Sequence, residues 1–415
     1  MSCINRHKSN SGFSLIELLV VVAIIGVLAT LTGVSMNNAR RASRDPRRLS
    51  DIKQIQLALR LYYLDNGTYP SAVTGGGSIA AHGTSYLLRV PENPLPQSDG
   101  NCPAAGYRYH SLEGGQVFTL NFCLGTRADT LTAGQYSATA SGILGCPTGY
   151  TRVVGSPLLG TTDFCAMTYE AKCSADSETV ALTAEGAHDN LAAPCPPGKV
   201  VSRVEGVPIA NVSLADARAY CATAGAHLMT NAEWMTIARD AELLPDNWEA
   251  GTVGIGFMPR GNFGADFVVQ DGSDPYAGGE LADDFTWYRP LALSTDDVIW
   301  DMSGNVSEWI DDSCLSGNGE GKYSEIGAAS PVFWDAAALQ DFELTAAGPH
   351  LPLWLTGDYY GSYRGCSGDG QPMIRGGGVH DGDREESDRS PGLYFLDMSR
   401  KPDTTFSTTG FRCVK

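Results

Sequence analysis

An apolar run near the start of the chain begins with Gly12-Phe13-Ser14-Leu15-Ile16-Glu17-Leu18-Leu19 and continues to Val34. A helix needs about 20 predominantly apolar residues to cross a bilayer, so the segment 13–34 is predicted to be a membrane helix. A secretory signal peptide fits less well, because its apolar region is shorter and ends in a small-residue cleavage site. An ordinary anchor leaves Glu17 unexplained, because a carboxylate inside a membrane is costly and marks a function.

The same string resembles the cleavage and assembly signal of type IV pilins and pseudopilins. The resemblance implies that a prepilin peptidase cuts after Gly12, that the new terminal residue Phe13 is methylated, and that Glu17 meets the terminal amine of a neighbouring subunit. A buried charge that finds its partner only on assembly can fix the register of a fibre. The implied partners are other pilin subunits and the pilus assembly machinery. The implied location is the inner membrane before assembly and the outside of the cell, on a pilus or pseudopilus, afterwards.

The residues that follow are similar to the second half of a pilin helix. Ile52, Ile55, Leu59 and Tyr62 lie at helical spacing on one face, and Asn66-Gly67 predicts the end of the helix. Pro46 predicts a kink or a break between the two halves. Five arginines strain the positive-inside rule and are interpreted as a solvated helix face that pairs with acidic neighbours in the fibre: Arg40, Arg41, Arg44, Arg47 and Arg48.

The composition of the 415-residue chain indicates a loop-rich globular protein of two or three domains. Its formal net charge of −18 argues against a nucleic-acid partner, because phosphate contacts need a basic face. The chain has 11 cysteines, an odd number. Cleavage after Gly12 removes Cys3 and leaves an even set, all able to pair in an oxidising compartment.

The order of segments predicts the domain organisation. A leader over residues 1–12 and the membrane helix are followed by a pilin-like head over 35–138, in which a small antiparallel sheet packs on the helix and Cys102 and Cys123 form a candidate disulfide. The small, polar segment 139–145 is a candidate linker. A loop-rich domain is expected over 146–415. The predicted fold class is therefore α+β.

Five motifs in the carboxyl-terminal two thirds follow one another in a recognisable order. Capped helices are predicted after Ser213 and after Thr230. The string Trp300-Asp301-Met302-Ser303-Gly304-Asn305-Val306-Ser307-Glu308-Trp309 comes next, and Ile374-Arg375-Gly376-Gly377-Gly378 and Gly410-Phe411-Arg412-Cys413 complete the series. In this order they resemble the formylglycine-generating-enzyme-like (sulfatase-modifying factor) domain, a fold related to C-type lectins and poor in regular secondary structure.

Catalysis in that family depends on residues that this chain replaces. The oxidases bind copper through two cysteine thiolates, which are soft ligands that select Cu(I). The matching positions here are Asp381 and Glu386, and neither supplies a thiolate. Iron-dependent relatives use a histidine cluster, whereas the seven histidines here are scattered. We therefore expect no copper and no enzyme activity, with an enzyme of the formylglycine-generating class on a pilin anchor as the alternative.

The last forty residues resemble the variable region of proteins diversified by diversity-generating retroelements, in which framework positions stay fixed and chosen positions vary. The resemblance implies a ligand-binding face for an unknown protein or glycan. The alternative is an ordinary polar surface loop. The predicted ligand-binding residues are Val379, His380, Asp381, Asp383, Arg384, Tyr394, Asp397, Ser399, Arg400, Asp403, Thr404, Thr405, Phe406, Ser407 and Thr408.

A structural metal ion and one disulfide are implied by the second resemblance. The matching segment of the formylglycine-generating enzyme wraps a calcium ion, so Asp301 and Glu308 would supply carboxylate oxygens, and Gly304 and Val306 backbone carbonyls. The alternative is a buried turn without metal. The family also pairs Cys221 with Cys413. Two further disulfides, Cys146 with Cys165 and Cys173 with Cys195, are proposed from proximity in the sequence.

The combined prediction is a pilin-like surface subunit that displays a lectin-like, hypervariable ligand-binding domain for adhesion or recognition. Besides the enzyme, a second alternative is a minor pseudopilin of a secretion or DNA-uptake system, in which the large domain contacts only other subunits.

Overall fold

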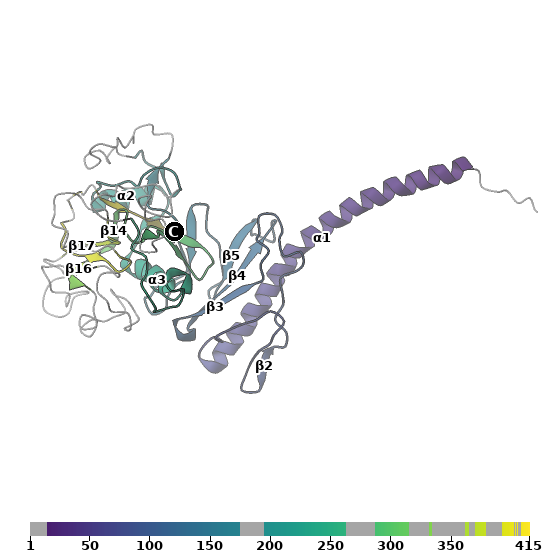
Figure 1. Ribbon diagram of the computed structural model, residues 1–415, viewed down its shortest axis with the longest axis horizontal. Helices are drawn as coiled ribbons and strands as arrows, with labels where there is room; N and C mark the ends of the chain where they lie inside the picture. Colours follow the sequence, from purple (N-terminus) through teal and green to yellow (C-terminus); the bar gives the residue numbers. More distant parts are fainter. Residues whose placement is uncertain are drawn as a thin grey trace, which may run out of the picture.

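The computed structural model describes residues 15–174, 195–262, 287–314, 332–333, 362–364, 370–378, 392–401, 403, 405 and 408–415. For residues 26–42, 314, 332–333 and 362–364 it describes the backbone alone. Figure 1 shows a long helix projecting from a small sheet, with a larger domain on the far side of that sheet.

The first element, α1, is one helix from Leu15 to Asn66. Ile52, Ile55 and Leu59 are fully buried, which confirms the predicted apolar face. Burying such a side chain is worth about 1.5–3 kcal/mol. Gly67 follows with φ +72°, and its N–H donates to the Tyr63 carbonyl, which confirms the predicted helix end.

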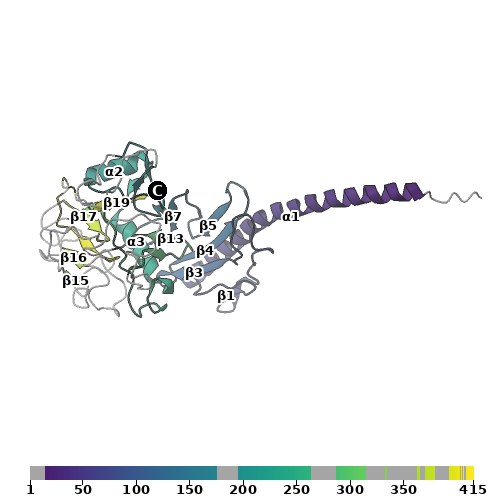
Figure 2. The same cartoon turned by 45° about the horizontal axis from the view of Figure 1, so that its top comes forward.

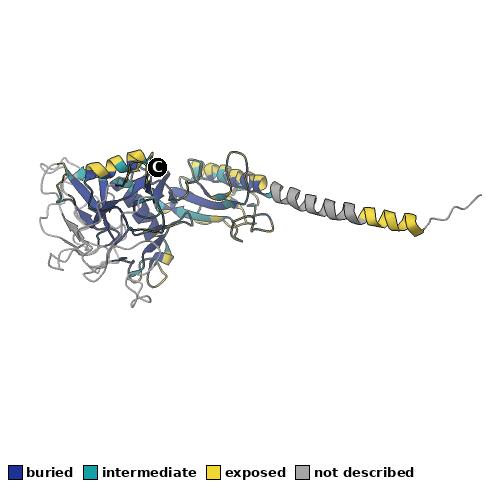
Figure 3. Ribbon diagram, turned by 90° about the horizontal axis from the view of Figure 1, so that it is seen from above, coloured by how far each residue is buried: buried dark blue, intermediate teal, exposed yellow. Residues whose placement is uncertain are grey.

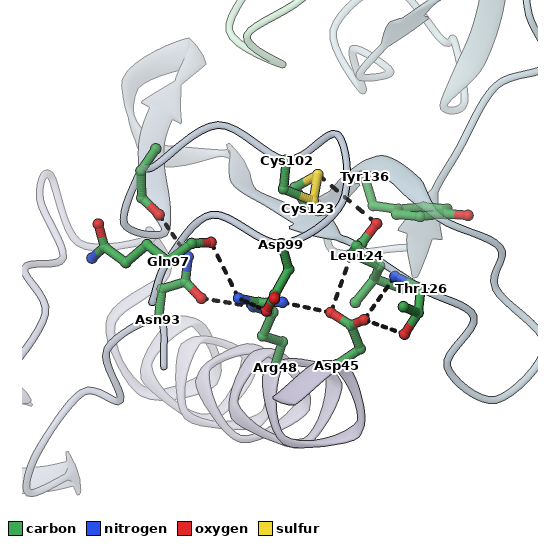
Figure 4. Close-up of a disulfide and its surroundings, with 12 residues drawn as sticks. Asp45, Arg48, Asn93, Gln97, Asp99, Cys102, Cys123, Leu124, Thr126 and Tyr136 are labelled. Carbon is green, nitrogen blue, oxygen red and sulfur yellow. Dashed lines mark hydrogen bonds and ion pairs between the residues drawn. A yellow bond between two sulfur atoms is a disulfide. The ribbon is translucent and has the colours of Figure 1, made fainter. Parts of the chain in front are cut away.

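Of the kink or break predicted at Pro46, the break does not occur, since the helix continues through this residue. Contacts on both sides of the proline explain why. The Asp45 carboxylate accepts hydrogen bonds from Thr126, and Arg48 Nη1 lies 2.6 Å from Asp45 Oδ1 (Figure 4). These tertiary contacts hold the turn in place although proline removes one helical hydrogen bond.

Five arginines of this region were expected to form a solvated face that pairs in a fibre, and the structure describes the side chains of Arg44, Arg47 and Arg48. Arg47 is exposed, whereas Arg44 and Arg48 pair within the chain. Arg44 binds both carboxylate oxygens of Asp99 at 2.5 Å. Arg48 is fully buried, and Nη2 lies 3.0 Å from Asp99 Oδ2 while Nε donates to Asn93. These bonds, together with the Arg44 and Arg48 guanidinium groups, lower the pKa of Asp99. The loop beneath Cys102 is thereby fixed to α1.

The head sheet packs against α1. Its strands are β3 (Arg108–Leu112), β4 (Val117–Leu124), β5 (Gly134–Ala138) and β6 (Ile143–Leu144), antiparallel and in the order β3-β4-β5-β6. A hairpin of β1 (Ile79–Ala81) and β2 (Thr84–Leu87) lies beside the helix. Phe118 and Leu120 of β4 join the helix face in one core, and Cys102 and Cys123 form the predicted disulfide.

The segment 139–145, expected to be a linker, contains β6 and is part of this sheet. Thr139 and Ser141 also donate to the Asp163 carboxylate of the larger domain. The small, polar residues of this segment therefore form a sheet edge and a contact, so the head sheet extends beyond residue 138.

The larger domain is built from small sheets around two short helices, so the fold is mixed α+β. One sheet has the order β11-β20-β8-β7, and a second has the order β15-β16-β18-β17-β14-β19. The strands of the first are β7 (Tyr150–Val153), β8 (Phe164–Met167), β11 (His227–Leu228) and β20 (Cys413–Val414). Those of the second are β14 (Ser307–Cys314), β15 (Val332–Phe333), β16 (Ser362–Arg364), β17 (Gln371–Arg375), β18 (Leu396–Asp397) and β19 (Thr409–Phe411). Two ribbons, β9 (Lys172–Cys173) with β10 (Val200–Val201) and β12 (Pro290–Ala292) with β13 (Val298–Trp300), complete the strands.

Both predicted caps are confirmed. Helix α2 spans Leu214–Thr223 behind Ser213, and α3 spans Asn231–Glu242 behind Thr230, each with a reciprocal capping box. Trp234 and Trp248 are buried in the core beneath α3. Figure 3 shows that buried residues fill this domain and the sheet side of α1, whereas the first turns of α1 are exposed.

Three disulfides staple the domain, and all three predicted pairs are confirmed: Cys146–Cys165, Cys173–Cys195 and Cys221–Cys413. The last joins residues 192 positions apart, and a closure of that length stabilises the fold by about 4–5 kcal/mol in the chain-entropy model.

Where side chains are described, no helix combines the length and apolar character needed to cross a membrane. Part of the predicted membrane segment 13–34 lies outside those residues.

Candidate functional site

The described part of the predicted ligand-binding face is organised by Asp397 at the end of β18. One carboxylate oxygen accepts from the backbone N–H and the hydroxyl of Ser399, and the other accepts from Arg400 Nε at 2.7 Å. Burial opposes the charged form, but the Arg400 guanidinium and the Ser399 donors outweigh it and lower the pKa of Asp397. A carboxylate therefore holds the chain in position as it leaves the sheet.

Between Arg400 and Thr408 the described side chains are exposed. Lys401, Asp403 and Thr405 all face solvent. They lie in the segment between β18, an interior strand of its sheet, and β19, an edge strand of the same sheet. A rigid sheet that carries exposed, chemically mixed residues on a connecting segment is the usual construction of a binding loop.

Besides Asp397, which is 4% exposed, two residues predicted on this face are buried. Tyr394 is fully buried, and its hydroxyl donates to Glu242 Oε2 at 2.8 Å. Thr408 is also buried, and its carbonyl accepts from the Ser307 N–H. Both belong to the buried framework. They were placed on the face because alternation in the sequence does not reveal which side chains point inward. The predicted residues outside the described part are Val379, His380, Asp381, Asp383, Arg384, Thr404, Phe406 and Ser407.

The framework beneath the face is held by buried polar contacts. The indole N–H of Trp234 donates to the Leu393 carbonyl at 2.9 Å. Arg375 binds the side-chain oxygen of Asn231 through Nη2 and Nε, at 2.6 and 3.0 Å. Helix α3 and strand β17 therefore fix the segment that leads into β18.

The segment Asp301–Glu308 forms a tight buried turn. Asp301, Gly304 and Asn305 adopt left-handed backbone conformations with φ of 58°, 77° and 59°. Gly304 is required, since a Cβ there would lie 2.5 Å from the Asn262 carbonyl oxygen. The side chain of Asn305 donates to Glu170, which also accepts from the Val306 N–H.

Two arginines form ion pairs with the carboxylates that were predicted to bind calcium. Arg289 Nε and Nη2 lie 2.6 and 2.9 Å from the two oxygens of Asp301. Arg412 binds Glu308 with a closest distance of 2.9 Å, and all four side chains are buried. Among the described residues no group of three or more His, Cys, Asp or Glu is placed to hold a metal. The Arg289 and Arg412 guanidinium groups thus bind the carboxylate oxygens that the predicted calcium ion would need, and Asp301 and Glu308 form buried ion pairs.

A third carboxylate, that of Glu170, lies near these pairs, and its surroundings disfavour its charged form. Burial, and then repulsion from Asp301 and Glu308, raise the pKa of Glu170 well above its usual value, although Arg412 opposes the rise. Sequence reasoning missed Glu170 and Arg289. The signal available for Arg412 was its place in the Gly410-Phe411-Arg412-Cys413 motif.

A partly exposed acid–base contact joins His227 Nε2 to Glu233 Oε1 at 2.8 Å. The hydrogen bond to Glu233 raises the pKa of His227. The second oxygen of Glu233 caps α3 through Thr230, so this carboxylate has a structural task. Asp381 and Glu386, which stand in place of the copper thiolates, lie outside the described residues.

The processing residues Gly12 and Phe13 also lie outside the described part, and Glu17 lies in the exposed first turn of α1. An acidic side chain is favourable at this end of a helix, because the unpaired N–H groups there carry partial positive charge.

Comparison with known proteins relates the two ends of the chain to different families. Residues 182–415 match the family described as "Sulfatase-modifying factor enzyme 1-like domain", and residues 7–33 match the "Prokaryotic N-terminal methylation motif". The chain is 30% identical over 100 residues to "Type II secretion system core protein G" of Aeromonas hydrophila, covering 21% of this chain and 70% of that protein. The proteins of the same name from Dickeya chrysanthemi (31% over 99 residues, 21% and 65% covered) and Pectobacterium carotovorum subsp. carotovorum (36% over 95 residues, 20% and 60% covered) are also similar. The chain thus spans between 60% and 70% of the length of these relatives.

Proposed function

Because the chain belongs to the sulfatase-modifying factor enzyme 1-like family over residues 182–415 and to that of type II secretion system core protein G near its amino terminus, we propose that it is a pilin-like subunit that displays a non-catalytic recognition domain. The subunit is cleaved after Gly12, methylated at Phe13, anchored in the membrane by its first helix, and assembled through that helix with other subunits.

The observation that carries this proposal is the placement of the two ends. Figure 1 shows α1 projecting from one end of the molecule and β16 and β17 at the opposite end. Strand β18, which pairs with both, delivers Arg400 and the exposed residues after it to that far end. The predicted face therefore lies at the end of the subunit opposite the helix that would pack in a fibre.

The same arrangement supports the proposal of a lectin-like scaffold with a diversified face. The buried framework of Asp397, Tyr394 and Arg375 tolerates changes at exposed positions such as Asp403 and Thr405, because those side chains take no part in the core. The absence of thiolates at Asp381 and Glu386 supports recognition over oxidation, since Cu(I) needs soft ligands.

The second candidate is a minor pseudopilin of a secretion system, and the similarity to core protein G favours it. In that case the large domain contacts other subunits and the residues 379–408 stay constant. The two candidates share the anchor and differ in what the far end binds.

The deciding experiment has two arms. Fibres sheared from the producing cells are analysed for the mature chain with methylated Phe13, and the codons for 379–408 are sequenced in sister cells. Surface fibres with variation confined to exposed positions support recognition. Constant codons, with the chain retained in a periplasmic pseudopilus, support the pseudopilin. An unprocessed chain that stays outside any fibre overturns both.

A further inference from the structure

A groove of about 760 Å³ lies on the head, between α1 and the loop that follows β2. Residues between 43 and 51 of α1 form one wall, and residues 89–95 form the other. The lining residues used below are Arg44, Arg47, Asp51, Arg89, Glu92 and Leu95. The groove is thus built from the head and from the part of α1 that enters it.

Two arginines, one on each wall, are free to bind an occupant. The Arg47 and Arg89 side chains are exposed, and neither has a hydrogen bond or an ion pair within the part of the chain that the structure describes. The neighbouring Arg44, by contrast, is paired with Asp99. A guanidinium group presents its N–H donors in a plane that matches the two oxygens of a carboxylate or a phosphate. The groove therefore favours an anionic group.

The carboxyl groups that line the groove do not use these arginines. Asp51 is 7% exposed and accepts a hydrogen bond from the Tyr107 hydroxyl at 3.2 Å. Burial raises the pKa of Asp51, although that hydrogen bond and the charge of Arg47 oppose the rise. The Glu92 side chain is exposed and lies beside Gly75. Neither carboxyl group forms an ion pair with the two guanidinium groups, so both guanidinium groups can accept an external partner.

The position of the groove on α1 argues against a lipid as that partner. The predicted membrane segment ends at Val34, and α1 continues as one helix to Arg47 and beyond. The intervening helix measures about 20 Å, whereas the headgroup layer on each side of a bilayer is about 5–8 Å thick. Leu95 is 82% exposed, and only an occupant with apolar surface of its own covers such a side chain. A protein carboxylate therefore fits better than a lipid headgroup or a free phosphate.

The charges of the chain divide unevenly between its two domains. Segment 35–145 carries 10 basic and 7 acidic residues, and segment 146–415 carries 17 basic and 39 acidic residues, so their formal charges are +3 and −22. Opposite potentials steer and orient two surfaces as they meet. Figure 2 shows β3, β4 and β5 between the larger domain and the projecting part of α1, so a chain does not bring its own larger domain to the groove. The matching acidic surface is that of another copy.

We propose that the groove is a docking site for the acidic larger domain of a second copy of this chain, with Arg47 and Arg89 binding carboxylates of that domain. The two surfaces differ, so each copy keeps one of them free for the next copy. A contact of this kind repeats along an open filament unless its rotation closes a ring. The inference rests on the proposed function, which requires assembly, and adds which surfaces of neighbouring copies meet.

Coupling by a carbodiimide tests the contact, because this reagent joins an amine to a carboxylate that touches it and adds no spacer. Arg47→Lys and Arg89→Lys place an amine in the groove. Each variant is prepared as the full mature chain in detergent, as an equal mixture of molecules with light and heavy nitrogen. Mass spectrometry should find peptides that join position 47 or 89 of one label to a carboxylate within 146–415 of the other label.

Two controls accompany the coupling. Lys53 Nζ lies 3.8 Å from Asp129 Oδ2, so these two residues should couple within one label and show that the reagent works. Arg127 is exposed and does not line the groove, so Arg127→Lys should give no mixed-label link to the larger domain.

Sedimentation of the mature chain in detergent measures the strength of the contact. Arg47→Glu and Arg89→Glu are each expected to weaken self-association at least tenfold at low salt. Added salt should weaken the association of the wild type, because exposed charges are screened. Arg127→Glu makes the same change in charge outside the groove and should alter self-association less than twofold.

The outcomes separate the contact from the proposed function. The docking site is overturned if no mixed-label link reaches 146–415, or if Arg127→Glu weakens self-association as much as the groove variants do. If that happens while the cells still carry fibres of the methylated chain, the proposed function stands without the docking site. Links that form in detergent while the cells make no fibre support the contact and overturn the proposed function.

Discussion

The side-chain amide of Asn121 in the head donates a hydrogen bond of 2.7 Å to the carbonyl oxygen of Ser294 in the larger domain. Thr119 Oγ1 donates to the same oxygen at 3.0 Å, and all three residues are buried. Asn121 is fixed in turn by the Ser137 hydroxyl. The two domains are therefore joined by a specific polar contact in addition to the covalent chain.

Replacing Asn121 with alanine should weaken this junction. The change leaves Ser294 with one donor and Ser137 without its acceptor, and a buried polar group that loses its partner costs about 1–3 kcal/mol. Calorimetry should show a lower melting temperature, with the transitions of the two domains moving apart. Gln54→Ala is the control, and equal melting curves for the two variants would contradict the role of the contact.

Asp240 should make the stability of the protein depend on pH in an unusual direction. Burial is the main reason that the pKa of Asp240 rises from 3.8 to about 6, and Glu113 adds to the rise, whereas the Ser294 hydrogen bonds and His110 oppose it. A carboxyl group whose pKa is raised by folding makes its full contribution to the stability of the folded state at pH values below its pKa in the unfolded chain. This contribution is lost as the pH rises through about 6. The loss is on the order of 3 kcal/mol.

Asp240→Asn tests that expectation, because the amide oxygen can still accept from the Ser294 N–H. Urea unfolding is measured for both proteins between pH 4 and pH 7. The free energy of unfolding of the variant minus that of the wild type should increase with pH over this window. A difference that stays constant would show that Asp240 does not titrate there.

The buried pairs at Asp301 and Glu308 predict stability without calcium. Asp301→Asn leaves the Arg289 guanidinium buried without a counter-charge, and breaking a buried pair from one side costs about 3–5 kcal/mol. Addition of a chelator should leave the melting temperature of the wild type unchanged. A melting temperature that falls with chelator and recovers with calcium would show that the ion displaces the arginines.

The cysteine count predicts a fifth disulfide. Four bridges use eight of the cysteines that follow Gly12, and the two that remain are Cys314 and Cys366, the second of which lies outside the described residues. We expect these two to pair in the oxidising compartment. Alkylation of the unreduced mature chain should add no mass, and two added groups would contradict the pairing.

Short sequence patterns predicted those elements that are determined by residues close together in the chain. The caps at Ser213 and Thr230, the end of α1 at Gly67 and the face with Ile52 and Leu59 each depend on residues a few positions apart. The pairing of Cys221 with Cys413 was available only through the family resemblance, since nothing near either residue in the sequence indicates it.

Contacts that the local sequence pattern does not show explain what was not predicted. Tyr394 is buried, and its hydroxyl donates to Glu242 of α3, while Asp301 pairs with Arg289, which directly precedes β12 of the β12–β13 hairpin. Segment 139–145 looks like a linker, but β5 and Asp163 fix it. In each case tertiary packing determines the partner, and a local sequence pattern does not indicate which residue that partner is.

The bridge between Cys221 and Cys413 also has a mechanical consequence. A ligand held beyond Arg400 while α1 is held in a fibre applies tension inside the loop that this bridge closes. The 192 residues between the two cysteines would measure roughly 650 Å if they were drawn out straight. The disulfide shortens the covalent path that carries the force. Most of the chain between the two cysteines therefore cannot extend under tension, and the subunit lengthens by only a small fraction of that distance.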